Sequence, residues 1–275
     1  MRALSLRRRD PRVYVTFDQA LTACKQKGAG WHLMTNAEWA FAALWCTQNG
    51  FWPRGNNNYG KDHSRNSETG EISYRYESSG TWYEGRVATG TGPGTWSHDG
   101  TPYGVWDLNG NVWEWVGGLR LNEGEIQILP DNNAADNTKD QSAASDDWKA
   151  VLQDGTLVEP GTEGTLKYDA TGTNGAGHAK LNTSITSRSD GTRYTSGTFQ
   201  TATAADGVTV PDLLKHLSLY PVDADHGSDG LYTRNVGERL PIRGGSWRNA
   251  SDAGVWYLYL RSRRSDSDYN FGFRP

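Results

Sequence analysis

Apolar and polar residues alternate with a helical period in two segments near the start of the chain. The first segment, 17–27, follows a threonine placed to cap a helix, Thr16, and stops before Gly28. Its apolar residues lie three or four positions apart on one face: Phe17, Ala20, Leu21 and Cys24. The pattern predicts an amphipathic helix over these residues.

The second helical segment, 36–48, carries a stronger start signal. Thr35 and Glu38 have the T-x-x-E spacing of a capping box, and Asn49-Gly50 ends the pattern. The apolar positions that follow the cap again share a face: Trp39, Ala42, Ala43 and Cys46. We therefore expect a second helix that packs this face into the core.

Beyond Gly50 the helical pattern disappears, and glycine-rich turns alternate with short aromatic segments. Near the C-terminus, 255–261 alternates as a strand does, with Trp256, Leu258 and Leu260 on a core face. The opposite face is predicted to meet solvent or a groove, and it holds Val255, Tyr257, Tyr259 and Arg261. Two helices and short strands predict an irregular, loop-rich α+β fold without internal repeats.

The tryptophans divide the chain of 275 residues into regions. Eleven of the twelve lie before residue 116 or after residue 246, and only Trp148 lies between them. The segment 118–240 is instead rich in Thr, Asp, Gly, Ala and Asn, although short apolar runs persist. We interpret 1–275 as one domain whose core comes mostly from 13–116 and 241–275, with 118–240 as a polar insertion.

Charge and hydropathy exclude two classes of partner. The net charge is −4, with 28 Lys and Arg against 32 Asp and Glu, which argues against nucleic-acid binding. No apolar run reaches transmembrane length, so no direct membrane insertion is expected. Residues 1–12 are basic but contain no apolar stretch, so no secretory signal is recognised. The chain would reach a phage virion or a cell surface by another route, and would otherwise be cytoplasmic.

Histidine and cysteine chemistry is sparse. The six histidines are scattered, and the best catalytic candidate, His98, has a structural role as its simpler explanation. Cys24 and Cys46 lie on the apolar faces of the two helices, where they act as buried hydrophobic residues or form a disulfide. Neither belongs to a His/Cys cluster with metal-ligand spacing.

Three motifs predict a scaffold of aromatic residues and buried polar groups. Glu114 lies between two tryptophans in GNVWEW, and such a carboxylate needs a cation or several N–H donors. The arginine of the terminal NFGFR, Arg274, is a natural partner. The paired glycines of RGGSW permit close backbone approach. The predicted scaffold residues are Trp113, Glu114, Trp115, Gly244, Gly245, Trp247, Trp256 and Arg274.

Together with LMTNAEWAFAA at 33–43, these motifs resemble the formylglycine-generating-enzyme branch of the C-type lectin fold, and they occur in the family's order. The family's oxidase uses a pair of C-terminal cysteines, but 241–275 contains none, so the resemblance implies that this activity is absent. The motifs of calcium-dependent sugar-binding lectins are also missing. No cofactor is required; Asp107, Asn111 and Glu114 hold either a structural Ca²⁺ or a metal-free hydrogen-bond network.

The last residues, 244–275, have an unusual composition. This C-terminal window contains five Arg and three Asp but no Lys, Glu, Gln or Met. Changing only the adenines of the asparagine codon AAC gives, among others, Asn, Ser, Asp, Tyr and Arg, but never Lys, Glu, Gln, Met or Trp. The window therefore resembles that of a diversity-generating retroelement variable protein, in which adenine-directed mutagenesis rewrites the 3′ end of the gene.

This resemblance implies a non-catalytic protein that binds a protein or cell-surface ligand through a variable C-terminal face. Two alternatives stay open: a member of the formylglycine-generating family with an oxidase or partner-subunit role, and a phage structural or adhesion protein with a fixed ligand. The alternative for the window itself is a merely polar edge of the fold. The predicted ligand-binding residues are Arg248, Asn249, Ser251, Asp252, Tyr257, Tyr259, Arg261, Ser262, Asp266, Asp268, Tyr269 and Asn270.

Overall fold

Both N-terminal helices form where their caps predict them in the computed structural model, which describes residues 2–275. Helix α1 spans Phe17–Lys25, with reciprocal cap bonds between Thr16 and Gln19. It ends two residues before the predicted end, because the turn at Gln26 closes its last backbone bonds. Helix α2 spans Asn36–Gln48 with the predicted Thr35–Glu38 capping box.

Short strands make up most of the remaining regular structure. A separate hairpin joins β1, Arg75–Ser78, to β2, Thr81–Glu84. The other strands form one mixed sheet. They are β3 Trp113–Trp115, β4 Leu119–Asn122, β5 Glu125–Ile128, β6 Lys149–Val151, β7 Leu157–Val158, β8 Lys167–Ala170, β9 Ala179–Asn182, β10 Thr195–Thr198, β11 Thr203–Ala204, β12 Gly230–Thr233, β13 Glu238–Arg243, β14 Leu258–Ser262 and β15 Phe271–Phe273.

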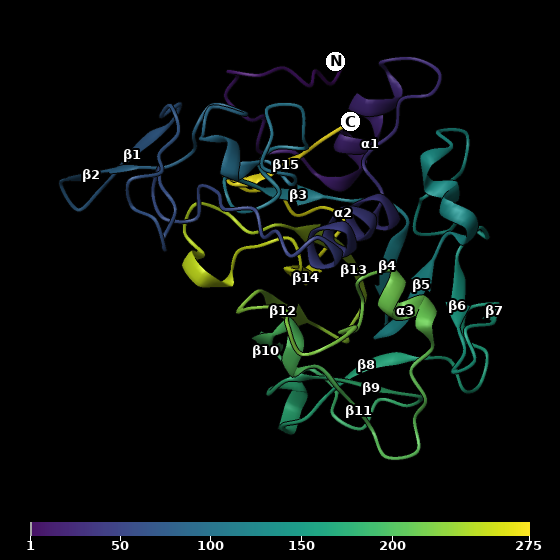
Figure 1. Cartoon of the computed structure of the whole chain (residues 1–275). Helices are drawn as coiled ribbons and strands as arrows, with labels where there is room; N and C mark the ends of the chain where they lie inside the picture. Colours follow the sequence, from purple (N-terminus) through teal and green to yellow (C-terminus); the bar gives the residue numbers. More distant parts are fainter. Residues whose placement is uncertain (1) are drawn as a thin grey trace.

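The insertion, 118–240, contributes strands to this sheet. Strand β13 pairs with β4 through its first residues and with β3 and β14 through its last ones, so it joins the insertion to the rest of the fold (Figure 1). Strand β12 lies parallel to β14 and makes a second connection. The short helix α3, Asp212–His216, also belongs to this region and contacts α2. The insertion is thus short-stranded and integrated into the sheet.

Most buried aromatic residues come from the two predicted core segments, as expected. The insertion adds Trp148, Tyr168 and Phe199. The larger apolar cluster combines Trp39 of α2 and the predicted core face of β14 with leucines of the insertion. The two segments and the insertion therefore share a core. The predicted core face, Trp256, Leu258 and Leu260, is fully buried and confirmed.

The two cysteines are buried and unbonded. Cys24 packs in the cluster beneath α1 and Cys46 in the cluster beneath α2, so the disulfide alternative is wrong. Burial raises the pKa of both thiols to about 12, which leaves them protonated near neutral pH. Among residues 2–275, no helix is long and apolar enough to cross a membrane.

Candidate ligand-binding face and its scaffold

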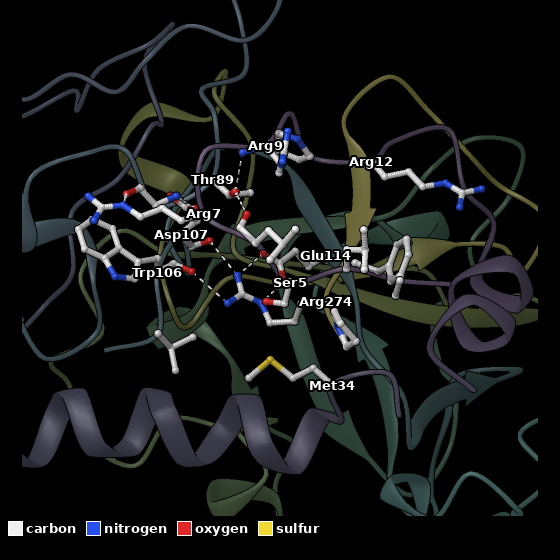
Figure 2. A pocket seen from close by; sticks show the side chains of 18 of the residues that line it. Ser5, Arg7, Arg9, Arg12, Met34, Thr89, Trp106, Asp107, Glu114 and Arg274 are labelled. Atoms are coloured by element: carbon white, nitrogen blue, oxygen red, sulfur yellow. Dashed lines mark hydrogen bonds and ion pairs between the residues drawn. The ribbon is translucent and has the colours of Figure 1, made fainter. Parts of the chain in front are cut away.

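The predicted pair of Glu114 and Arg274 forms through strand pairing. Strand β15 lies parallel to β3 with Gly272 opposite Glu114, which brings the terminal arginine beside the carboxylate. The Arg274 guanidinium donates to both carboxylate oxygens and, at 3.0 Å, to the carbonyl of Trp106 (Figure 2). Burial alone would lower the pKa of Arg274, but Glu114 outweighs this effect and the pKa is raised. Arg274 thus joins the C-terminal strand β15 to β3 and to the loop at Trp106.

The glycines of RGGSW are required by close backbone approach. Gly244 and Gly245 both have φ near +84°, in the left-handed region. A Cβ on Gly245 would lie 2.7 Å from the Cβ of Ala253. The turn places Trp247 in a buried position against Tyr269, with ring centroids 5.6 Å apart. Trp247 thus forms part of the buried support on which Tyr269 of the C-terminal window packs.

Arg243, which precedes these glycines, is a scaffold residue that sequence reasoning missed. It is fully buried, and its guanidinium donates to the Asn36 side chain at 2.6 and 3.1 Å and to the Ser218 carbonyl at 3.0 Å. Neutral oxygens therefore hold this charge, and burial lowers its pKa. The arginine connects the start of α2 with the turn that follows α3 in the insertion.

The structure favours a hydrogen-bond network over a ligand set at Asp107, Asn111 and Glu114. The side-chain oxygen of Asn111, Oδ1, accepts from the Val87 backbone N–H at 3.0 Å and from the Asn56 side-chain amide at 3.2 Å. Both Glu114 oxygens face Arg274, and one Asp107 oxygen accepts from Gly90. No metal-ready group of three His, Cys, Asp or Glu exists within 2–275. Protein hydrogen bonds thus occupy most of the side-chain oxygens that the calcium alternative would need.

Asp107 is the exception within this network. Its second carboxylate oxygen is buried without a hydrogen-bond partner, and burial raises the pKa of the group to about 6. The network lies on the wall of a cavity of about 1010 Å³ beneath the N-terminal segment, where Arg7 and Trp106 stack (Figure 2). The sequence did not predict this cavity, because the N-terminal residues that line much of it carry no recognisable motif.

Part of the predicted binding face collects around one groove of about 710 Å³. Strand β14 and the turn after it supply most of its lining. The predicted residues on the groove are Tyr259, Arg261, Ser262, Asp266 and Asp268. Two lining residues, Arg234 and Arg239, precede the C-terminal window, and the sequence carries no local signal that places them beside it. The remaining lining residues are Arg263, Ser265, Ser267 and Phe271.

The other predicted residues lie apart from the groove. Arg248 is exposed and donates to the Tyr269 hydroxyl, whose ring packs on Trp247. Ser251 is exposed, while Asn249 and Asp252 are partly buried. Aromatic rings at the β1–β2 hairpin lie next to Trp247. Tyr76 stacks on Tyr83 with ring centroids 5.4 Å apart, and Tyr74, just before β1, has its ring centroid 6.2 Å from that of Trp247.

Three predicted binding residues are buried, and their predicted exposure is wrong. Tyr257 is 2% exposed, because the strand begins at Leu258 and a turn at Gly254 directs the Tyr257 ring onto Trp113. The assumed strand alternation therefore fails for Val255 as well. Ser262 is covered where β14 passes the bulge in β13, and Asn270 is covered where its amide approaches Ser246.

The geometry at His98 agrees with a structural role. Its Nδ1 accepts a hydrogen bond from the Val105 backbone N–H at 2.8 Å, and its ring packs against Trp45 with centroids 4.9 Å apart.

The scaffold and the groove are separate arrangements. Hydrogen bonds within the protein hold the scaffold side chains, whereas the groove is open to solvent.

Comparison with known families covers the N-terminal part of the scaffold, including Trp113, Glu114 and Trp115. The family model of the sulfatase-modifying factor enzyme 1-like domain matches residues 2–149, more than half of the chain. This match supports a C-type-lectin-like fold for the mixed sheet and its few helices. It ends before the C-terminal window and the groove. No curated protein matches the chain.

Proposed function

The chain belongs to the family of sulfatase-modifying factor enzyme 1-like domains, and from this premise we propose that it is a non-catalytic ligand-binding protein. Its C-terminal face recognises a protein or cell-surface ligand. Diversification by a retroelement changes the accessible residues of this face and leaves the scaffold intact.

The observation that carries the proposal is the division of the C-terminal window into supports and open positions. Trp247, Trp256 and Leu258 are buried, whereas Tyr259 and Arg261 line a groove beside them. A rigid support with few rotatable side chains loses little conformational entropy on binding. Such a face can change its ligand without changing its fold.

The state of the thiols argues against oxidation by this chain. Thiol oxidation requires an accessible thiolate, but Cys24 and Cys46 are buried and their pKa values are raised to about 12. The protein, incubated with a sulfatase-type cysteine peptide, should yield no aldehyde product in a hydrazide-capture assay. Stoichiometric aldehyde formation would overturn the non-catalytic assignment.

Diversification rests on the composition of the window and has its own test in the surrounding DNA. A near-copy of the 3′ end of the gene, differing at adenines and lying beside a reverse transcriptase gene, is the expected finding. A gene without such a copy, with an unchanging window across strains, would favour a phage adhesion protein with a fixed ligand.

Binding capacity is tested by selection from a displayed library. We would randomise Arg248, Ser251, Tyr259, Arg261 and Asp268 and select against an immobilised protein such as lysozyme. The proposal predicts binders that compete for the same face. The matched control library randomises exposed positions of the insertion and should yield none above background. Equal yields from both libraries would contradict a specialised C-terminal face.

A further inference from the structure

The groove contains three arginines that form no direct ion pair with a carboxylate of the described chain. Arg234 lies between β12 and β13, Arg239 lies in β13 and Arg261 lies in β14. Across the described residues 2–275, none of the three makes an ion pair. Arg263, on the rim, does pair with Asp266 at 2.9 Å. Unbalanced guanidinium groups gathered on one cavity favour a bound anion.

The three side chains are held in place but keep unused donors. Arg239 is 7% exposed, and it donates to the carbonyls of Val236 at 2.9 Å and Arg261 at 3.3 Å. The Nε atoms of Arg234 and Arg261 are buried and have no hydrogen-bond partner. The Arg261 guanidinium lies 3.1 Å from the centroid of the Tyr194 ring, which restricts its orientation. These contacts fix the orientation of the Arg239 and Arg261 guanidinium groups before any ligand arrives.

The sign of the charge on the groove is opposite to that of the whole protein. Its lining contains four arginines and two aspartates, a formal charge of +2, whereas the chain carries −4. Burial lowers the pKa of Arg239, and the charges of Arg234 and Arg263 lower it further, whereas Asp266 and Glu123 oppose this change without cancelling it. Like charges in a partly desolvated site repel one another, and an anion relieves that repulsion.

We propose that the groove binds an acidic peptide segment of a protein ligand, with Arg234 and Arg239 as fixed anchors for its carboxylates. A guanidinium fork matches a carboxylate bidentately. Asp268, together with Ser265 and Ser267 on the rim, supplies acceptors for peptide N–H groups. Both anchors precede the C-terminal window, so they stay constant while Tyr259 and Arg261 vary. The preference for acidic ligands therefore belongs to the scaffold.

This inference deepens the proposed function and is tested with defined probes on the full chain. Fluorescence anisotropy would measure binding of labelled hexaglutamate, hexaglutamine and a heparin-derived hexasaccharide. Hexaglutamate should bind at least tenfold more tightly than hexaglutamine, and its affinity should fall as NaCl rises. Arg239→Gln should weaken it about tenfold and Arg234→Gln several-fold, because each removes one charged anchor. The matched control, Arg65→Gln, removes an exposed charge outside the groove and should leave binding unchanged.

The outcomes separate this inference from the function on which it rests. Equal affinities for hexaglutamate and hexaglutamine, or unchanged hexaglutamate binding in Arg234→Gln and Arg239→Gln, would overturn it. Binding of the sulfated hexasaccharide alone would overturn the peptide assignment. If Arg239→Gln does not fold, Arg239→Lys replaces it beside Arg234→Gln, because it keeps the charge but removes the bidentate fork and should still weaken hexaglutamate binding. Binders selected from the randomised window would leave the proposed function standing whichever probe fails.

Discussion

The arginines of the scaffold and those of the groove share one chemistry but differ in what they contact. Arg274 donates to both oxygens of Glu114, and Arg243 donates to buried neutral oxygens. Arg234, Arg239 and Arg261 make no ion pair within the described chain, and two of them keep a buried donor unused. Arg243 also keeps one buried nitrogen without a partner, so the difference lies in the surroundings: enclosed arginines hold the fold together, whereas those that line the open groove remain for a ligand.

The largest expected effect comes from breaking the scaffold pair. Glu114→Ala leaves the partly buried Arg274 guanidinium without its carboxylate, so the free energy of unfolding should fall by about 3 kcal/mol, the lower end of the range for a buried pair. Urea denaturation measures this loss. Glu77→Ala, at an exposed position of β1, is the control and should change stability by less than about 0.5 kcal/mol. Equal stability of the two variants would show that the pair does not support the fold.

Two tyrosines separated by one residue sharpen the comparison. Tyr257 packs on Trp113 with centroids 4.5 Å apart and is fully enclosed, so Tyr257→Ala should cost about 3–5 kcal/mol. Tyr259 lines the groove and is partly exposed, so Tyr259→Ala should cost about 1 kcal/mol. Thermal melts of both variants give the values. A larger loss for Tyr259 would place that residue in the core.

A smaller effect depends on pH. The pKa of Asp107 is about 6 in the folded protein and near 4 in an unfolded chain, so the folded state binds the proton more tightly. The contribution of Asp107 to stability should therefore fall as pH rises from about 4 to about 6 and level off above that, by roughly 3 kcal/mol at most.

Asp107→Asn removes this titration while keeping the shape of the side chain and its left-handed backbone, with φ of 61°. Urea midpoints of the variant and the parent, measured between pH 4 and pH 7, should diverge with rising pH in favour of the variant. Parallel curves would contradict the raised pKa.

The smallest effect on stability is expected at the groove. Arg261→Ala loses its stacking on Tyr194, worth at most about 1 kcal/mol, but no ion pair. The melting temperature should therefore stay within a few degrees of the parent, while hexaglutamate binding weakens several-fold. A collapse of the fold would make Arg261 a scaffold residue like Arg243.

Local signals in the sequence were sufficient for the helices and for the scaffold pair. The Thr35–Glu38 cap acts within one turn and starts α2 where predicted, and the helix ends at Gln48, before the predicted stop at Asn49-Gly50. The partnership of Glu114 with Arg274 followed from the need to neutralise a buried charge. Strands of two to four residues in the insertion carry no comparable signal, because pairing with distant segments creates them.

The binding face was only partly predictable for the same reason. Strand alternation placed Tyr257 outside, but a turn at Gly254 shifts the start of the strand and turns the ring inward. Arg239 looked like any other arginine of the insertion. Its role becomes visible only when the pairing of β13 with β14 places it beside Arg261.

The central claim is that accessible and buried positions of the same window divide binding from folding. Melting temperatures of two small libraries test it most directly. One library randomises Arg248, Ser251 and Arg261, and the other randomises Tyr257, Ser262 and Asn270. We predict that most members of the first melt within a few degrees of the parent and that most members of the second do not fold. Similar distributions in both libraries would contradict the account.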